Sequence, residues 1–148
     1  MGLILPFSIA INLILKLFNR LPFCQYLLFK FSPIQANAKS AIYSFDLGAT
    51  SADIPVSQLS GGNQQKVVLS RELAGEPQLM VGMQLTRGLD VGATEAVQQQ
   101  LLKERERGAG IVYICTELEE FMTMSDRIAV MYRGEFVSVL DANNTTIE

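Results

Sequence analysis

Leu-Ser-Gly-Gly-Asn-Gln-Gln-Lys, at residues 59–66, is a polar turn that runs directly into a helical pattern with one apolar face at residues 67–74. Ser60 is a favourable N-cap, because its hydroxyl can accept a hydrogen bond from an unpaired N–H of the first turn. Gly61 and Gly62 carry no Cβ, so a ligand can approach the backbone closely. The turn is a candidate anion site, although an ordinary capped surface helix explains a bare Ser-Gly-Gly at least as well.

The eight residues taken together resemble the signature motif of ABC transporter ATPases. The Asn-Gln-Gln ending resembles the importers of simple sugars and nucleosides. Three further segments, at residues 86–93, 116–120 and 125–134, match later motifs of that family in the same order. The resemblance covers nearly all of the chain but only a little more than half of one cassette. We identify the chain as similar to the C-terminal portion of the second cassette, from the signature motif to the C-terminal hairpin.

The resemblance implies an α/β fold with a parallel, P-loop NTPase-like sheet that is incomplete and has a helical subdomain at its N-terminal end. We expect residues 1–58 to form this helical subdomain, and residues 59–148 to form the signature helix and the C-terminal part of the ABC ATPase core. Strands that are apolar on both faces, as at 78–83 and 111–115, are typical of a buried parallel sheet. The other predicted elements are helices at 9–18 (capped by Ser8), 35–46, 93–107 (capped by Asp90 and closed by Gly108) and 117–124, and a hairpin of 128–132 with 135–140.

In the ABC family the signature motif contacts ATP that is held on the Walker A loop of a partner cassette. The resemblance therefore implies that Ser60, Gly61, Gly62 and Gln64 face the γ-phosphate of ATP in trans. Residues 86–90, which we call the D-loop segment, resemble the D-loop that crosses the interface between cassettes in this family. The resemblance implies that Asp90 braces this interface. ATP is the implied cofactor, with its Mg²⁺ held by the partner cassette, and we expect no metal site in this chain.

Several catalytic positions of the family are altered or not present in this sequence. Met83 and Gln84 stand where the family has the Mg²⁺-orienting Asp and the catalytic Glu, and Thr116 stands at the switch histidine. Methionine is not a hard oxygen ligand for Mg²⁺, and glutamine cannot take a proton from water. The Walker A pattern does not occur. We therefore expect no ATP hydrolysis by this chain alone.

The amino-acid composition limits the kinds of partner that the chain can bind. The net charge is −3, so the chain has no basic field that would attract nucleic acid. The chain also has no histidine. Cys24 and Cys115 are far apart in sequence, fit no metal spacing and are expected to be buried, reduced thiols of a cytosolic protein. Residues 2–18 are almost wholly apolar, but Pro6, Asn12 and Lys16 interrupt the run, so we predict that it does not span a bilayer.

The implied partners are another ABC ATPase cassette and transmembrane permease subunits, without nucleic acid. The implied location is cytoplasmic, peripheral on the inner face of the cell membrane. Two alternatives remain open at this point: a non-catalytic fragment that docks on a permease through residues 2–31, and a truncated gene product without activity of its own. The transported substrate cannot be read from the sequence, because specificity in this family belongs to other subunits.

Overall fold

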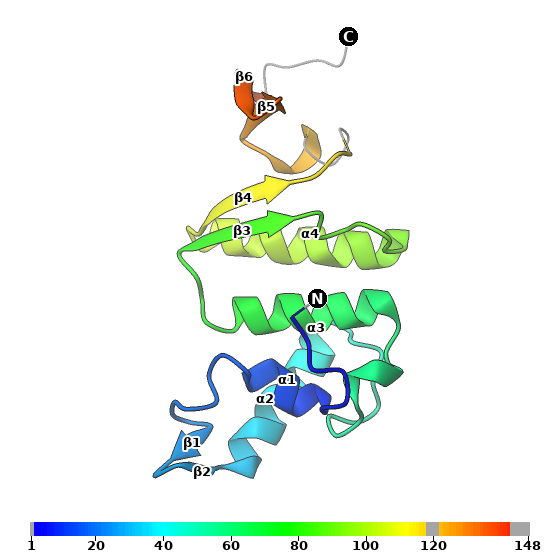
Figure 1. The fold of residues 1–148 in the computed structure, drawn as a ribbon, viewed down its shortest axis with the longest axis vertical. Helices are drawn as coiled ribbons and strands as arrows, with labels where there is room; N and C mark the ends of the chain where they lie inside the picture. The colour runs from blue at the N-terminus through cyan, green and yellow to red at the C-terminus, as the bar shows by residue number, and fades with distance from the viewer. Residues whose placement is uncertain (1, 118–121, 143–148) are drawn as a thin grey trace.

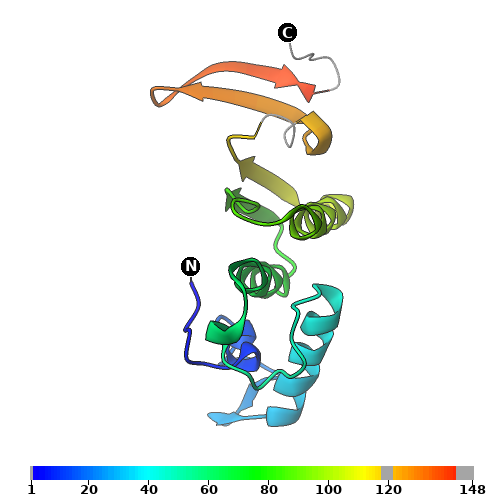
Figure 2. The same cartoon turned by 90° about the vertical axis from the view of Figure 1, so that its right-hand side faces the viewer.

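The computed structural model describes residues 2–117 and 122–142, and it is elongated, with a helical end and a β-hairpin end (Figures 1 and 2). Two long helices, α3 and α4, lie across the middle, and two parallel strands, β3 and β4, lie beyond α4 (Figure 1). In chain order the elements are α1 (Ile9–Ile14), β1 (Cys24–Gln25), β2 (Leu28–Phe29), α2 (Phe31–Ser44), the 3-10 turn η1 (Val56–Gln58), α3 (Gly61–Leu73), β3 (Leu79–Met83), α4 (Val91–Glu106), β4 (Gly110–Ile114), β5 (Arg127–Tyr132) and β6 (Glu135–Asp141).

The described strands form three separate two-stranded sheets. β3 and β4 pair in parallel, from Leu79 opposite Gly110 to Met83 opposite Ile114, and α4 is the connection between them. β1 with β2 and β5 with β6 are antiparallel pairs. A parallel pair joined through a helix is the βαβ unit of α/β proteins, so the predicted fold class is confirmed.

Helix α3 lies between two apolar cores. The first core joins α1, α2 and the loop before α3, and includes Val67 of α3. The second core is formed by Leu69 and Leu73 of α3 with Val97 and Leu101 of α4. Residues two apart on an α-helix point about 200° apart. Val67 and Leu69 therefore bury opposite sides of the same helix.

The predicted helix caps are confirmed. The side chains of Ser8, Ser60 and Asp90 each accept a hydrogen bond from the backbone N–H three residues later. Gly108 follows α4 with a φ of 97°. Its N–H donates to the carbonyl of Arg105 at 2.8 Å, and the next N–H donates to the carbonyl of Glu104 at 3.0 Å. This pair of bonds is the Schellman motif, which satisfies carbonyls at the helix end.

The bounds of three helices differ from those predicted. Residues 61–66, predicted as a polar turn, belong to α3, which begins at Gly61. α1 ends at Ile14 and not near residue 18, because the chain tightens there into turns, with the N–H of Leu17 donating to the carbonyl of Ile14 at 2.8 Å. α2 begins at Phe31 and not at residue 35, and ends at Ser44. Pro33 is accommodated because it lies in the first helical turn, where backbone N–H groups have no acceptor within the helix.

The prediction that both strands of the parallel pair are buried is wrong. Val81 and Met83 of β3 are 63% and 70% exposed, and Val112 and Ile114 of β4 are also exposed. α4 covers one face of the pair, where Met80 and Ile111 pack against the second core. The other face has no covering element among the described residues.

The C-terminal hairpin is confirmed, as β5 and β6. The predicted short helix at 117–124 lies partly outside the described residues, and residues 122–124 are helical. Within the described ranges, none of the helices has the length and apolar character needed to cross a membrane.

Asn12 has a structural role that its polarity in an apolar run did not indicate. Its side chain is 0% exposed. Its Oδ1 accepts the N–H of Ile4 at 2.9 Å, and its Nδ2 donates to the carbonyls of Ile4, Phe7 and Ser8 at 3.0–3.1 Å. This amide therefore joins the segment before α1 to the helix itself.

We predict that Asn12→Ala lowers the free energy of unfolding by about 1–3 kcal/mol, because it removes the acceptor of the Ile4 N–H and a second donor from three carbonyls. Urea unfolding of the variant measures the change. Asn19→Ala is the matched control, since Asn19 is exposed in the same segment and its loss is expected to cost less than about 0.5 kcal/mol. Equal effects of the two substitutions would contradict the assigned role of Asn12.

Candidate functional site

Residues 59–62, which we call the signature turn, include the N-cap Ser60 and the first two residues of α3. The outer side of this turn is open. Ser60 is exposed, and its Oγ accepts the N–H of Asn63 at 3.3 Å. A Cβ added at Gly61 would meet no atom within 4 Å. The N–H groups at the start of a helix have no acceptor within the helix. The turn can therefore receive an anion at the backbone of Gly61 and Gly62, with the Ser60 hydroxyl beside it.

Gln64 is turned toward the protein and not toward the open side of the turn. Its Nε2 donates to the carbonyls of Val56 at 3.2 Å and Leu59 at 3.1 Å. Both amide hydrogens therefore bind the loop that carries the signature turn. A phosphate contact by this amide nitrogen would need the side chain to rotate, and the contact stays a prediction from the family resemblance.

The structure brings the signature turn close to the D-loop segment. A Cβ added at Gly62 would lie 3.3 Å from Cδ2 of Leu89. The side-chain amide of Gln65 donates to the carbonyl of Leu85. Asp90 follows Leu89, and its exposed carboxylate accepts the N–H of Ala93 at 2.8 Å. The predicted site residues at 60–62 and at 90 thus lie on two segments in direct contact.

Lys66 and Thr86 support this arrangement, and the sequence reasoning gave neither a role. Lys66 is buried, and its Nζ donates to the carbonyl of Asp46 at 3.0 Å, which holds the loop after α2 against α3. Thr86 is buried in the D-loop segment, with its Oγ1 2.9 Å from the hydroxyl of Tyr113 on β4. Lys66 could have been singled out in the sequence because it is the last residue of the motif at 59–66.

Met83, Gln84 and Thr116 come together at the carboxyl ends of the parallel strands. The N–H of Gln84 donates to the carbonyl of Ile114 at 2.7 Å, and Thr116 is exposed just beyond that strand. The Oε1 of Gln84 accepts a hydrogen bond from Arg87 at 2.9 Å. A thioether and an already bonded amide do not suit Mg²⁺, which prefers oxygen ligands in octahedral geometry. No group of three potential His, Cys, Asp or Glu metal ligands occurs in the part of the chain that the structure describes.

The C-terminal end of α3 is held by charged groups. Arg71 is buried, and its Nη1 donates to the carbonyl of Gly2 at 2.6 Å, while its Nη2 lies 3.1 Å from Glu72. Lys16, which follows α1, also pairs with Glu72. Burial acts to raise the pKa of Glu72, but the hydrogen bonds and charges of Lys16 and Arg71 outweigh it, so the pKa is lowered from 4.5.

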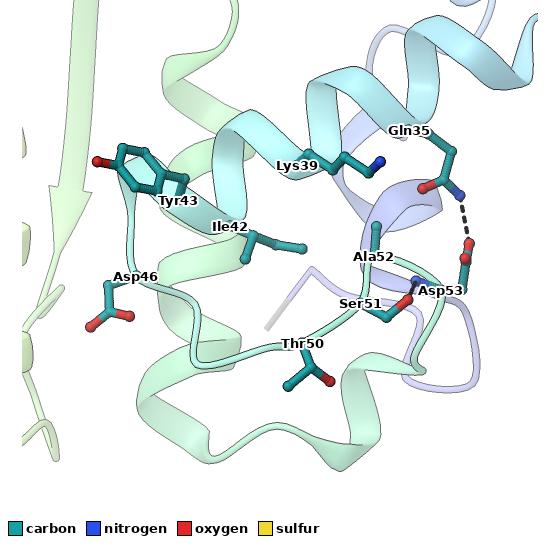
Figure 3. A pocket seen from close by; sticks show the side chains of 9 residues that line it. All are labelled: Gln35, Lys39, Ile42, Tyr43, Asp46, Thr50, Ser51, Ala52 and Asp53. Atoms are coloured by element: carbon teal, nitrogen blue, oxygen red, sulfur yellow. Dashed lines mark hydrogen bonds between the residues drawn. The ribbon is translucent and has the colours of Figure 1, made fainter.

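A separate open cavity of about 880 Å³ lies between α2 and the loop before η1 (Figure 3). Gln35 donates to Asp53 across its rim at 2.5 Å. None of the predicted site residues lines it. The lining residues are Gln35, Lys39, Ile42, Tyr43, Asp46, Thr50, Ser51, Ala52 and Asp53.

Solved ATP-binding cassettes of ABC transporters share the fold of this chain. A dimeric structure of the cassette MJ0796 in a post-hydrolysis state, bound to ADP and Pi, matches with a TM-score of 0.81 at 25% identity. The match covers 95% of this chain and 59% of that chain. A nucleotide-free cassette from an ABC transporter matches in fold, with a TM-score of 0.73 at 19% identity over 92% of this chain and 56% of that chain.

The curated proteins that are similar in sequence to this chain are ATP-binding proteins of importers. The nucleoside import ATP-binding protein NupA of Lactococcus lactis subsp. cremoris is 35% identical, over 98% of this chain and 29% of its own length. The guanosine import ATP-binding protein NupO of Bacillus subtilis is 36% identical, over 98% of this chain and 28% of its own length. The ribose import ATP-binding protein RbsA of Lactococcus lactis subsp. lactis is 37% identical, over 99% of this chain and 30% of its own length. No family model matches the sequence.

The chain is thus similar, along nearly its whole length, to a segment of ATP-binding proteins of sugar and nucleoside importers. It spans about three tenths of the length of these curated relatives.

Glu72 provides a test of the contacts that hold α3. A carboxylate whose folded-state pKa lies below its unfolded value of 4.5 stabilises the fold above that pH and loses this contribution as the pH falls through the folded-state pKa. We therefore predict that Glu72→Gln lowers the free energy of unfolding at neutral pH, and that its deficit from wild type shrinks below about pH 4.

Chemical unfolding at a series of pH values measures this difference. Glu76→Gln is the control, because Glu76 is exposed shortly after α3 and makes no ion pair with another described residue. A Glu72→Gln deficit that stays constant between about pH 7 and about pH 3 would contradict the prediction.

Proposed function

We propose that this chain is the ATP-binding segment of a sugar or nucleoside importer whose signature turn completes an ATP site on a second cassette. The observation that carries the proposal is the signature turn itself. Its outer side is open at Gly61, its Ser60 hydroxyl is exposed, and its helix is capped and held on two sides. The names of the curated relatives support ATP as the ligand and sugars or nucleosides as the class of transported solute.

The energetics favour a contribution in trans over independent nucleotide binding. An anion at a helix N-terminus gains about 0.3–1 kcal/mol when exposed, and up to about 2 kcal/mol when partly buried. Micromolar affinity needs about 8 kcal/mol. The signature turn therefore adds to a site whose phosphate loop and Mg²⁺ are supplied by another cassette. Met83 and Gln84 are consistent with this division of roles, since neither suits Mg²⁺.

The proposed assembly follows from the same reasoning. Asp90 lies on the segment that contacts the signature turn, and we assign it to bracing the interface with the second cassette. The relatives are import proteins, which supports permease subunits as further partners and a position on the inner face of the cell membrane. We assign residues 1–58 to the helical subdomain, and residues 59–148 to the signature helix and the ATPase core.

The substitution Gly61→Glu tests the trans contribution. It places a side chain and a negative charge on the open side of the turn, where the γ-phosphate is proposed to lie. We predict that ATP-dependent association of this chain with an intact cassette of a sugar or nucleoside importer weakens at least tenfold, which corresponds to about 1.4 kcal/mol. Analytical ultracentrifugation with and without Mg-ATP measures the association.

Gly75→Glu is the matched control. Gly75 follows the other end of α3, is exposed, and has no atom within 4 Å of an added Cβ. This control adds the same charge just beyond the other end of the helix and is expected to associate like wild type. If wild type and Gly61→Glu associate equally, or if neither associates in an ATP-dependent way, the trans role of the signature turn is refuted.

A further inference from the structure

The β1–β2 hairpin presents apolar side chains to solvent at the helical end of the molecule. Its turn residues Tyr26 and Leu27 are 89% and 97% exposed, and Leu28 beside them is also exposed. Both turn residues have positive φ, 51° and 64°. Hairpin turns with this backbone strongly favour Asn and Gly. The chain thus places two highly exposed side chains, Tyr26 and Leu27, on a backbone that is unfavourable for them.

Further exposed apolar residues flank the hairpin in the chain. Phe18 and Leu21 precede it, and Phe31 follows it at the start of α2. We call Phe18, Leu21, Tyr26, Leu27, Leu28 and Phe31 the hairpin surface. Single exposed apolar residues are ordinary, but a group of this size in fourteen consecutive residues indicates a binding surface.

The charge around the hairpin surface is positive. Residues 1–45 contain Lys16, Arg20, Lys30 and Lys39 and no Asp or Glu, although the whole chain has a net charge of −3. The charge of Lys16 is compensated by its pairing with Glu72. Arg20 and Lys30 are exposed, lie on either side of the hairpin in sequence, and form no ion pair with another described residue. An anionic partner therefore meets an uncompensated positive charge here.

We propose that the hairpin surface binds the headgroup region of an anionic phospholipid membrane, with Tyr26, Leu27 and Leu28 inserted and Arg20 and Lys30 at the lipid phosphates. Tyrosine and leucine with nearby Lys and Arg are the side chains that suit this interface. Stable attachment of a peripheral protein generally takes two signals, such as an apolar anchor and basic residues. An acidic protein surface would complement the charge, but it would leave the protruding Leu27 without the apolar environment that a lipid interface supplies.

This contact is independent of the proposed ATP site. In Figure 1 the hairpin lies at the lower left, while α3 begins at the right-hand side of the molecule, so a membrane at the hairpin leaves the signature turn accessible. The inference adds a lipid contact of the chain's own to the permease contact proposed above.

Co-sedimentation of the full chain with lipid vesicles tests the proposal. We expect binding to phosphatidylcholine vesicles that contain phosphatidylglycerol, and at least tenfold weaker binding to phosphatidylcholine alone. Leu27→Ser with Leu28→Ser should reduce binding to the anionic vesicles at least tenfold. Arg20→Gln with Lys30→Gln should remove most of the dependence on phosphatidylglycerol and on salt, since each basic residue near an anionic surface contributes about fivefold in affinity.

The control is Val81→Ser with Met83→Ser, which removes two other exposed apolar side chains, from β3, at a distance from the hairpin in the fold. Circular dichroism checks that all variants are folded. The proposal is refuted if wild type does not bind anionic vesicles, or if the hairpin and β3 variants lose binding equally. It is also refuted if the hairpin variant binds vesicles like wild type but loses capture by a purified permease, because the surface then serves a protein partner.

Discussion

Burial of α3 on two opposite sides is the constraint on which the rest of the structure depends. Val67 packs into the core of the helical end, and Leu69 and Leu73 pack against α4. Because both contacts fix the same helix, its first turn has a defined position relative to both ends of the molecule. Lys66 and Gln65 add polar contacts from this helix to the loop after α2 and to the D-loop segment. An anion site built on backbone N–H groups needs such support, because its selectivity depends on where the helix end is held.

Features that depend on local chemistry could be predicted from the sequence. The caps at Ser60 and Asp90 and the helix end at Gly108 follow from side chains and backbone conformations within a few residues. The parallel pairing of β3 and β4 was implied by the family resemblance and is present. The contact of the signature turn with the D-loop segment needed coordinates, because residues far apart in sequence form it.

Features that depend on distant partners could not be predicted. The continuous apolar run of β3 indicated burial on both faces, but burial requires a second covering layer, which the described residues do not supply. Asn12 interrupted an apolar run, and only the path of the preceding segment shows that its amide is fully bonded. Gln64 illustrates the same limit of local reasoning, since its amide hydrogens bind carbonyls of the loop that the motif itself follows.

Native-state hydrogen exchange tests the central role of α3 most directly. Amides that open only with the whole fold exchange most slowly. If α3 joins both cores, the amides of residues 67–73 should be among the slowest in the chain, and slower than those of the β5–β6 hairpin. Leu69→Ala should then accelerate exchange in both α1 and α4. Exchange in α3 as fast as in β5–β6, or acceleration confined to α4, would contradict the account.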